Sequence, residues 1–302
     1  MDMKRILKKA REISAPYRVD DGKKFKLKRF DPADTGGLSS EDKPRAKEAL
    51  ADGIEALAAL QDRLYAQDRW SVLLIFQAMD AAGKDGAIKH VMSGVNPQGC
   101  QVYSFKAPSA EDLDHDFLWR TTKCLPERGR IGVFNRSYYE EVLVVRVHPE
   151  ILGNQKLPPQ LVTKKIWGSR YESIGDFERH LAGNGVLIRK FFLNVSKDEQ
   201  LRRFMERLDN PDKNWKFSSA DAKEREHWDE YMSAYADMIR ETSSERAPWY
   251  VVPADNKWYT RMVVAAAVID ALGELELEYP KVDKEKMKEL AVTRAALLKK
   301  AK

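Results

Sequence analysis

Phosphate binding is the first chemistry that the sequence suggests. In the segment FQAMDAAGKDGAIKH, residues 76–90, Gly83 and Lys84 match the Gly-Lys pair of the phosphate-loop template G-x-x-x-x-G-K-[ST]. Ala78 stands where the template has its first glycine, and Asp85 stands where it has Ser or Thr. An apolar run precedes the segment and a helical pattern follows it, so N–H groups at the start of that helix could bind a phosphate. The alternative is a strand–turn–helix connection in which the glycines serve geometry alone.

The departures from the template point to a metal ion. Without a hydroxyl after Lys84, one usual Mg²⁺ ligand is missing, whereas Asp80 places a carboxylate inside the loop. A carboxylate in an anion-binding loop is understandable if it holds Mg²⁺, with Mn²⁺ as the alternative metal. We therefore predict that Asp80 binds the metal and that Lys84 reaches a terminal phosphate. The predicted phosphate-binding loop residues are Ala81, Ala82, Gly83, Lys84, Asp85 and Gly86.

A second group of candidate residues lies in FNRSYYEEVL, residues 134–143. Arg136 follows a predicted strand, and its guanidinium could bind two phosphate oxygens at once. Glu140 and Glu141 come about one turn later and could serve as metal ligands or as a base. The alternative for two adjacent glutamates is a solvated helix start, where acidic side chains favour the helix dipole.

A third group is basic and spans residues 202–217. A predicted helix with three arginines runs into a loop with two lysines. These residues are Arg202, Arg203, Arg207, Lys213 and Lys216. Such a segment could close over a phosphate site as a lid that excludes water and stabilises charge. The alternative is a surface helix whose cations pair with Glu199, Glu206 and Asp209.

Alternating strand and helix patterns predict the scaffold for these residues. Buried strands are expected at residues 71–77, 100–105, 130–135, 185–195 and 249–253. Helices are expected at residues 84–93, 111–125, 197–208, 219–242 and 256–275. This order predicts an α/β fold with a doubly wound, five-stranded parallel sheet flanked by helices. Ligands bind at the carboxyl ends of such strands, which places Arg136 beside the phosphate loop.

Composition and charge limit the other classes. The chain has 302 residues, 43% of them hydrophobic, which is enough for a sizeable core. Its apolar runs are far shorter than the ~20 residues that span a bilayer, and no signal-like segment begins it. We therefore expect a cytoplasmic protein without a membrane partner. Cys100 and Cys124 are expected to be reduced thiols.

The predicted domain, residues 41–280, is flanked by a basic N-terminal arm, residues 1–40, and a basic C-terminal tail, residues 281–302. Residues 1–30 contain eleven Lys and Arg against four Asp and Glu. Basic ends can bind nucleic acid, an anionic membrane or a polyanion, or they can simply be solvated.

The motifs taken together resemble the polyphosphate kinase 2 family, which moves phosphate between inorganic polyphosphate and nucleotides. The resemblance covers residues 18–280 and rests on KRFDP, MDAAGKDG, GVNPQG, FNRSYYEEVLVVRV, FFLNVSKDEQ, ERLDNPDKNWKF and APWYVVPADNKWY. In that family the phosphate loop has this DAAGK form, so Ala78 and Asp85 are family features. The resemblance implies a P-loop-kinase-like fold with a helical lid at about residues 200–220, and a homo-oligomer, either a dimer or a tetramer.

The resemblance also implies roles for individual residues. Asp80 would be the loop carboxylate that acts through Mg²⁺, Lys84 the loop lysine and Arg136 the arginine after the third strand. Arg207, Lys213 and Lys216 would form the basic lid. Many members have Asp where this chain has Asn135. The subgroup with Asn has an acidic pair shortly afterwards, here Glu140 and Glu141, and resembles the class that accepts both AMP and ADP.

The expected reaction is a reversible transfer of a terminal polyphosphate phosphate to AMP or ADP, with guanine nucleotides as alternative acceptors. The expected catalytic residues are Asp80, Lys84, Arg136, Glu140 and Glu141. Among them Asp80, Glu140 and Glu141 would bind the metal, and Asn135 and Glu140 would contact the nucleotide. Glu141 is one methylene longer than the Asp often found there.

Two other functions compete with this hypothesis. One is an ATP-dependent nucleotide or small-molecule kinase of the same fold. The other is a nucleic-acid-binding protein that uses its basic ends. The sequence contains no recognisable RNA- or DNA-reading motif, so polyphosphate and nucleotides are the expected partners.

Overall fold

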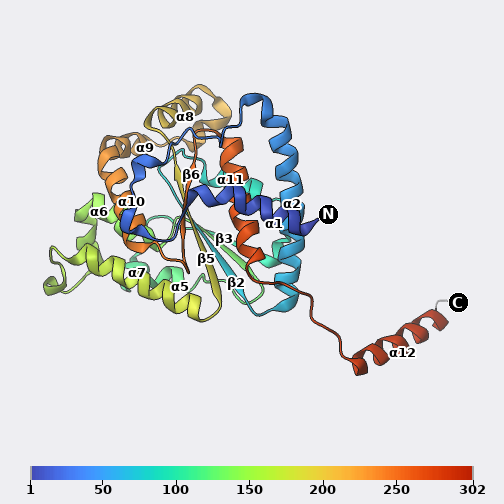
Figure 1. Ribbon diagram of the computed structural model, residues 1–302. Helices are drawn as coiled ribbons and strands as arrows, with labels where there is room; N and C mark the ends of the chain where they lie inside the picture. The colour runs from blue at the N-terminus through green and yellow to red at the C-terminus, as the bar shows by residue number, and fades with distance from the viewer. Residues whose placement is uncertain (1, 301–302) are drawn as a thin grey trace.

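A central sheet organises the protein. The computed structural model describes residues 2–300, and of Lys216 and Lys300 it describes only the backbone. The strands are β1 (Arg18–Val19), β2 (Ser71–Gln77), β3 (Cys100–Ser104), β4 (Ile131–Asn135), β5 (Val186–Asn194) and β6 (Trp249–Pro253). They form a six-stranded sheet in the order β1-β6-β5-β2-β4-β3, with helices on both faces (Figure 1).

The sheet is mixed. Its five longer strands lie where the sequence predicts strands, and each neighbouring pair among them is parallel. At the edge, β1 runs antiparallel to β6, with Arg18 opposite Tyr250 and Val19 opposite Trp249. The prediction of a five-stranded, wholly parallel sheet is therefore wrong in this respect. Two residues are too few to show an alternation of apolar and polar side chains, so the pattern could not reveal β1.

The winding of the chain places ligand-binding loops together. After β2 the chain passes through α3 (Lys84–Val91) to the edge strand β3 and then returns to β4 beside β2. It next crosses to the opposite side of β2, where β5 and β6 follow. The loops after β2 and β4 therefore meet at the carboxyl end of the sheet, where the strand order reverses and where ligands bind in open α/β sheets.

Two helical layers cover the sheet. On one face α3 packs with α1 (Met3–Ser14), α2 (Lys43–Gln67) and α11 (Lys257–Gly273). On the other face lie α6 (Val144–Val147), α7 (Ile166–Gly183) and α10 (Trp228–Thr242) (Figure 1). Successive side chains of β5 point to opposite layers: Arg189 donates to Glu274 Oε2 (2.5 Å), and Lys190 donates to Glu178 Oε2 (2.6 Å).

The remaining helices differ in part from the sequence pattern. They are α4 (Ala110–Leu113), α5 (Trp119–Thr122), α8 (Lys197–Asp209), α9 (Ser219–Glu224) and α12 (Lys284–Lys300). The helix predicted over residues 111–125 is thus two short helices. The helix predicted over residues 219–242 is divided into α9 and α10 by a 3₁₀ turn, Arg225–His227. Apolar periodicity alone does not detect such breaks, because it continues across them.

Residues 2–40 belong to the folded body. Tyr17, Val19 and Phe25 are buried in the main core. The Tyr17 hydroxyl also donates to Asp34 Oδ2 (2.6 Å). The predicted basic arm, residues 1–40, therefore contributes apolar side chains to the core of the domain that it flanks. Helix α12 extends away from the body (Figure 1), and residues 301–302 of the expected tail lie outside the described part.

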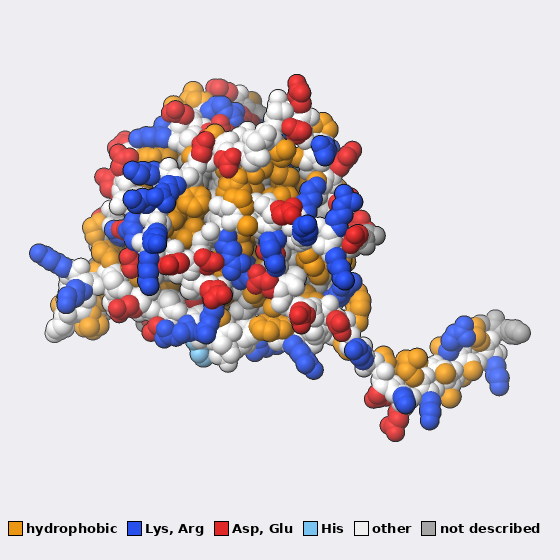
Figure 2. All heavy atoms as spheres, in the orientation of Figure 1, with side chains coloured by type: hydrophobic (Ala, Val, Ile, Leu, Met, Phe, Trp, Pro, Cys, Tyr) orange, Lys and Arg blue, Asp and Glu red, His pale blue; other side chains and the backbone are white. Residues whose placement is uncertain are grey.

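The surface carries charges of both signs. On the face shown in Figure 2, Lys and Arg side chains are interspersed with Asp and Glu across the body. This face differs from the single-sign basic patch that marks many nucleic-acid-binding proteins. Within residues 2–300, no helix combines the length and the apolar character needed to cross a membrane.

The packing of the N-terminal residues predicts the effect of a small substitution. A Cβ at Gly22 would lie 1.9 Å from the Arg240 carbonyl oxygen of α10. We expect Gly22→Ala to lower the free energy of unfolding by about 1–3 kcal/mol, because backbone must move to remove the clash. Urea denaturation followed by circular dichroism measures the change.

The matched control is Gly175→Ala in α7, where a Cβ would meet no atom within 4 Å. This variant should be as stable as the parent or more stable by up to about 1 kcal/mol, since Ala favours a helix over Gly. Equal stabilities of Gly22→Ala and the parent would show that Gly22 does not lie against the Arg240 carbonyl group as described.

Candidate functional site

The loop between β2 and α3 has a backbone shape that suits phosphate binding. All seven residues of β2 are buried, and α3 begins at Lys84. Gly83 caps this helix with φ = 106°, a conformation that favours glycine. Ala81 also has positive φ, 61°, which costs an L-residue about 1–2 kcal/mol. Other contacts must therefore hold Ala81, and strained backbone of this kind is common at functional sites.

Lys84 lies inside the loop. Its Nζ donates to the carbonyl oxygen of Ala78 (2.7 Å) and, at longer range, to that of Met79 (3.4 Å). Burial lowers the pKa of Lys84 from its ordinary value, and the nearby Asp80 opposes that shift only in part. The ammonium group thus occupies the position from which it can turn from loop carbonyls to an anion.

Arg136 and Asp80 meet across the carboxyl ends of β2 and β4. Arg136 Nη2 lies 2.8 Å from Asp80 Oδ1. The Arg136 backbone has φ = 62°, and its N–H donates to the Phe76 carbonyl oxygen (3.0 Å). Burial alone would lower the pKa of Arg136, but the carboxylates of Glu140 and Asp80 outweigh it and raise the pKa. The structure therefore brings Asp80, Lys84 and Arg136 together, as the sequence predicts.

Asp85 of the phosphate loop and Asn135 of the second motif are joined by a hydrogen bond. Asn135, at the end of β4, donates from Nδ2 to Asp85 Oδ1 (2.7 Å) in the first turn of α3. An amide at position 135 can donate to this carboxylate, whereas an aspartate would repel it. The Asn135–Asp85 hydrogen bond was not anticipated from the sequence, because the two residues lie in separate motifs.

The two glutamates after Arg136 point in different directions. Both lie in a 3₁₀ helix, Tyr138–Val142. Glu140 is half-buried near the site, and burial raises its pKa against the opposing effect of Arg136 and Lys84. Glu141 is buried elsewhere and accepts hydrogen bonds from Arg170 Nε (2.8 Å) and Gln155 Nε2 (2.6 Å).

The expected three-carboxylate metal site is therefore not assembled. Among residues 2–300 no group of three or more His, Cys, Asp or Glu side chains could hold a metal ion. Glu140 and Glu141 do not point to one place beside Asp80, because successive residues of a 3₁₀ helix face about 120° apart. Sequence adjacency of Glu140 and Glu141 does not show which of the two faces the site.

A buried polar network anchors the segment that carries Arg136 and Glu140. The hydroxyls of Tyr138 and Tyr139 donate to Glu178 Oε1 at 2.8 and 2.7 Å. Lys190 Nζ donates to Glu178 Oε2 and, at 3.0 Å, to the Tyr139 hydroxyl oxygen. Because every one of these side chains is at most 3% exposed, the network fixes the start of the segment to the interior.

A cavity of about 1010 Å³ opens over the phosphate loop. The basic side chains that line it are Lys84, Lys106, Arg136, Arg203, Arg207, Lys213, Lys257 and Arg261. The acidic ones are Asp80, Asp85, Glu206 and Asp221. Glu140 and Glu141 are not among its lining residues. An excess of cations over anions around a volume of this size suits a polyanionic ligand.

The predicted lid residues form one wall of this cavity. Arg207 lies 3.7 Å from Asp221 of α9, and Lys213 pairs with Glu206 of α8. Lys213 belongs to the 3₁₀ helix Pro211–Lys216 between α8 and α9, and the side chain of Lys216 lies outside the described part. Arg202 does not line the cavity, whereas Arg203 does. Both side chains donate hydrogen bonds to Glu199 at the start of α8.

Besides Lys106, three further charged residues of the cavity were not predicted. The pKa of Asp221 is raised mainly by burial and, to a smaller extent, by the negative charge of the nearby Asp80. Burial and the neighbouring Arg203 lower the pKa of Lys257 at the start of α11, where Arg261 follows one turn later. The only sequence signal was their position directly after the basic loop or the last strand.

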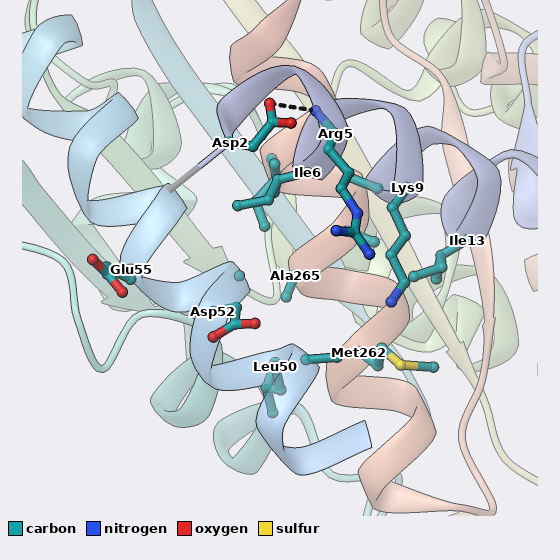
Figure 3. Close-up of a pocket in the computed structure, with 15 residues that line it drawn as sticks. Asp2, Arg5, Ile6, Lys9, Ile13, Leu50, Asp52, Glu55, Met262 and Ala265 are labelled. Atoms are coloured by element: carbon teal, nitrogen blue, oxygen red, sulfur yellow. Dashed lines mark hydrogen bonds between the residues drawn. The ribbon is translucent and has the colours of Figure 1, made fainter. Parts of the chain in front are cut away.

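A second, smaller cavity of about 430 Å³ lies apart from these residues, between α1, α2 and α11 (Figure 3). Ile6 and Ile13 of α1, Leu50 of α2 and Met262 of α11 supply apolar walls. Its lining comes from these three helices and from Asp2 at the cap of α1. The phosphate loop and the end of β4 lie outside it, so the larger cavity is the candidate functional site.

The chain is similar to known proteins over most of its length. The chain is 54% identical to an ADP-polyphosphate phosphotransferase of Rhodopseudomonas palustris over 284 residues, which is 94% of this chain and 98% of the relative. It is 47% identical over 264 residues to an AMP/ADP-polyphosphate phosphotransferase of Meiothermus ruber, covering 87% of this chain and 94% of the relative.

A solved structure is also similar. The crystal structure of polyphosphate kinase 2 from Arthrobacter aurescens TC1 superposes with a TM-score of 0.84 at 43% identity, covering 93% of this chain and 96% of that one. The family model described as polyphosphate kinase 2 matches residues 40–280. The chain therefore belongs to the polyphosphate kinase 2 family.

Proposed function

We propose that this protein transfers a terminal phosphate of inorganic polyphosphate to AMP or ADP in a reversible reaction. The observation that carries the proposal is the meeting of Asp80, Lys84 and Arg136 at the carboxyl ends of β2 and β4, within one cation-rich cavity. Phosphoryl transfer needs little covalent chemistry from the protein and depends mainly on positioning and charge stabilisation. The reaction therefore requires groups of the kind that meet here.

The phosphate loop would bind the phosphate that is transferred. Backbone N–H groups at the start of α3 lack partners within the helix and favour an anion there. Lys84 would turn from the Ala78 carbonyl to a phosphate oxygen, whose negative charge would favour the ammonium form in this buried place. Arg136 can bind two oxygens of one phosphate and so orient it.

The metal ion that the family resemblance implies could be held in the cavity by two carboxylates. Asp80 and Asp221 offer oxygen ligands, and the pKa of Asp221 is raised partly because Asp80 is near, so a cation would relieve their repulsion. Mg²⁺ is commonly held by one or two carboxylates together with substrate phosphates. Asp80 would therefore hold Mg²⁺, or Mn²⁺ as the alternative, with Asp221 as the second carboxylate. When bound, the metal would neutralise phosphate charge.

The nucleotide would lie near the end of β4. Asn135 lines the cavity. The carboxylate of Glu140 is close enough to Arg136 and Lys84 to attract their positive charges. This carboxylate would adjust the net positive charge that meets the acceptor phosphates. AMP and ADP are the primary acceptors that we propose, and guanine nucleotides are a second class.

The segment between Arg207 and Asp221 would act as a lid. It forms a wall of the cavity and carries Lys213 and Lys216 in the short 3₁₀ helix. Closure would bring these cations to the phosphates and exclude water, which strengthens every charge interaction inside. The expected homo-oligomer, a dimer or a tetramer, remains a prediction that light scattering on the purified protein would measure.

The donor distinguishes this function from its rivals. With AMP, polyphosphate and Mg²⁺ but no ATP, we expect ADP to form first and ATP afterwards, because the loop accepts a polyphosphate end. Product analysis by anion-exchange chromatography measures both steps. Phosphate transfer that occurs only when ATP is the donor would instead identify an ATP-dependent kinase of this fold.

Substitutions in the loop should remove turnover without unfolding the protein. We expect Lys84→Met and Arg136→Gln each to lower kcat by at least about 100-fold, the usual loss of a group that stabilises developing charge. Lys89→Met is the matched control, because Lys89 is an exposed lysine on the same helix α3. It should keep the parent's kcat.

Circular dichroism must show the same fold for the three variants. Full activity of Lys84→Met in a folded protein would contradict the proposed role of the loop.

Glu140 should influence the choice between AMP and ADP. Glu140→Gln removes a negative charge beside Arg136 and Lys84, so the site becomes more positive and favours the more negative acceptor. We expect the ratio of kcat/KM for ADP to that for AMP to rise about fivefold, equivalent to about 1 kcal/mol of charge interaction. Glu150→Gln is the control, since its side chain is 73% exposed. An equal ratio in both variants would exclude this role of Glu140.

A further inference from the structure

The carbonyl groups of the phosphate loop are bound from the side of α8. Gln200 Nε2 donates to the Asp80 carbonyl oxygen at 3.0 Å. Arg203 Nη1 donates to the next two carbonyl oxygens, those of Ala81 (3.0 Å) and Ala82 (2.7 Å). Gln200 and Arg203 are 1% and 3% exposed. Three consecutive peptide units of the loop are thus held by two buried side chains of one helix.

Every N–H of the Arg203 guanidinium has an acceptor within the protein. Besides the two loop carbonyls, Nη2 donates to the carbonyl oxygens of Ala254 (2.5 Å) and Asp255 (3.1 Å). Nε donates to Glu199 Oε1 (2.7 Å). A guanidinium has five N–H donors, and five acceptors are present here. Although Arg203 borders the cavity, its donors are therefore committed to protein groups rather than to a phosphate.

These contacts determine the direction of the loop N–H groups. In a trans peptide the C=O and the N–H of the next residue lie in one plane and point in opposite directions. When the carbonyls of Asp80 and Ala82 face α8, the N–H groups of Ala81 and Gly83 must face away from it. The same contacts hold Ala81 at φ = 61°, which it would otherwise leave for a right-handed conformation.

We propose that Gln200 and Arg203 are positioning residues that keep the phosphate loop in its anion-binding conformation. The expected effect of these residues on turnover rests on the proposed function, whereas their role in holding the loop does not. Arg203 also joins the loop after β2 to the loop after β6, since Ala254 and Asp255 follow that strand directly. The basic residue on α8 next to the phosphate loop thus acts on the substrate through the backbone.

The neighbouring Arg202 provides a matched control. Both arginines bind Glu199, but the Arg202 side chain is 60% exposed and Arg203 is 4% exposed. We expect Arg203→Gln to lower kcat about 100-fold, as small misplacements of catalytic groups do. The KM for polyphosphate should rise while the KM for AMP stays within about twofold, because the loop binds the donor. Arg202→Gln should leave all three values near those of the parent.

Conservative substitutions separate geometry from charge. Arg203→Lys retains the charge but cannot reach four carbonyls at once, so we expect activity close to that of Arg203→Gln. Gln200→Glu retains an acceptor for Arg225 Nη1 but loses the donor to the Asp80 carbonyl, and it should lower kcat about 10-fold. Full activity of Arg203→Lys would overturn the proposal, since charge alone would then suffice.

Hydrogen exchange tests the positioning role without any turnover. Amide exchange in residues 80–84 should become faster in Arg203→Gln and Gln200→Glu, while β2 stays as protected as in the parent and in Arg202→Gln. Unchanged exchange in the loop would refute the proposal. An inactive parent protein would refute the proposed function instead, and the exchange result would still decide the role of Arg203.

Discussion

The phosphate loop imposes the constraint on which the rest of the structure depends. If its N–H groups are to face a phosphate, its carbonyl groups must face the protein interior and find donors there, because buried carbonyls without partners are costly. Lys84 supplies a donor to Ala78 and Met79 within the loop, and Gln200 and Arg203 supply donors to the next three carbonyls. Helix α8 must therefore lie against the loop, which in turn fixes where the basic wall of the cavity begins.

A second buried network holds the opposite side of the site. Lys190 and Glu178 form a fully buried pair whose desolvation is expensive, and such pairs give little net stability by themselves. Glu178 also accepts hydrogen bonds from the hydroxyls of Tyr138 and Tyr139, and Lys190 donates to the Tyr139 hydroxyl. These tyrosines lie two and three residues after Arg136. The effect of this network is geometric, since Arg136 at φ = 62° needs neighbours that hold its backbone. Arg203 on one side of the cavity and Lys190 on the other thus hold the backbone that carries the site, and their donors bind protein groups.

The sequence predicts some parts of this arrangement much better than others. Buried parallel strands such as β2 are continuous apolar runs, and the end of each strand fixes the place of Lys84 or Arg136. The direction of Glu141 could not be predicted, because it depends on where Arg170 and Gln155 lie in the folded protein. The role of Arg203 was hidden for the same reason. A basic residue in a lid pattern suggests phosphate, whereas its actual acceptors come from loops about 50 and 120 residues away in the chain.

The mismatches between the loop and the common template become understandable as a coupled pair. Asp85 stands where the template has a hydroxyl, Asn135 ends β4, and the two side chains are joined by a hydrogen bond. The amide satisfies Asp85 and holds it at the first turn of α3, where a carboxylate also favours the helix dipole. Asp80 faces Arg136 instead and lines the same cavity as Lys84. In this chain Asn135 thus supplies a donor to Asp85, although fifty residues separate the two positions.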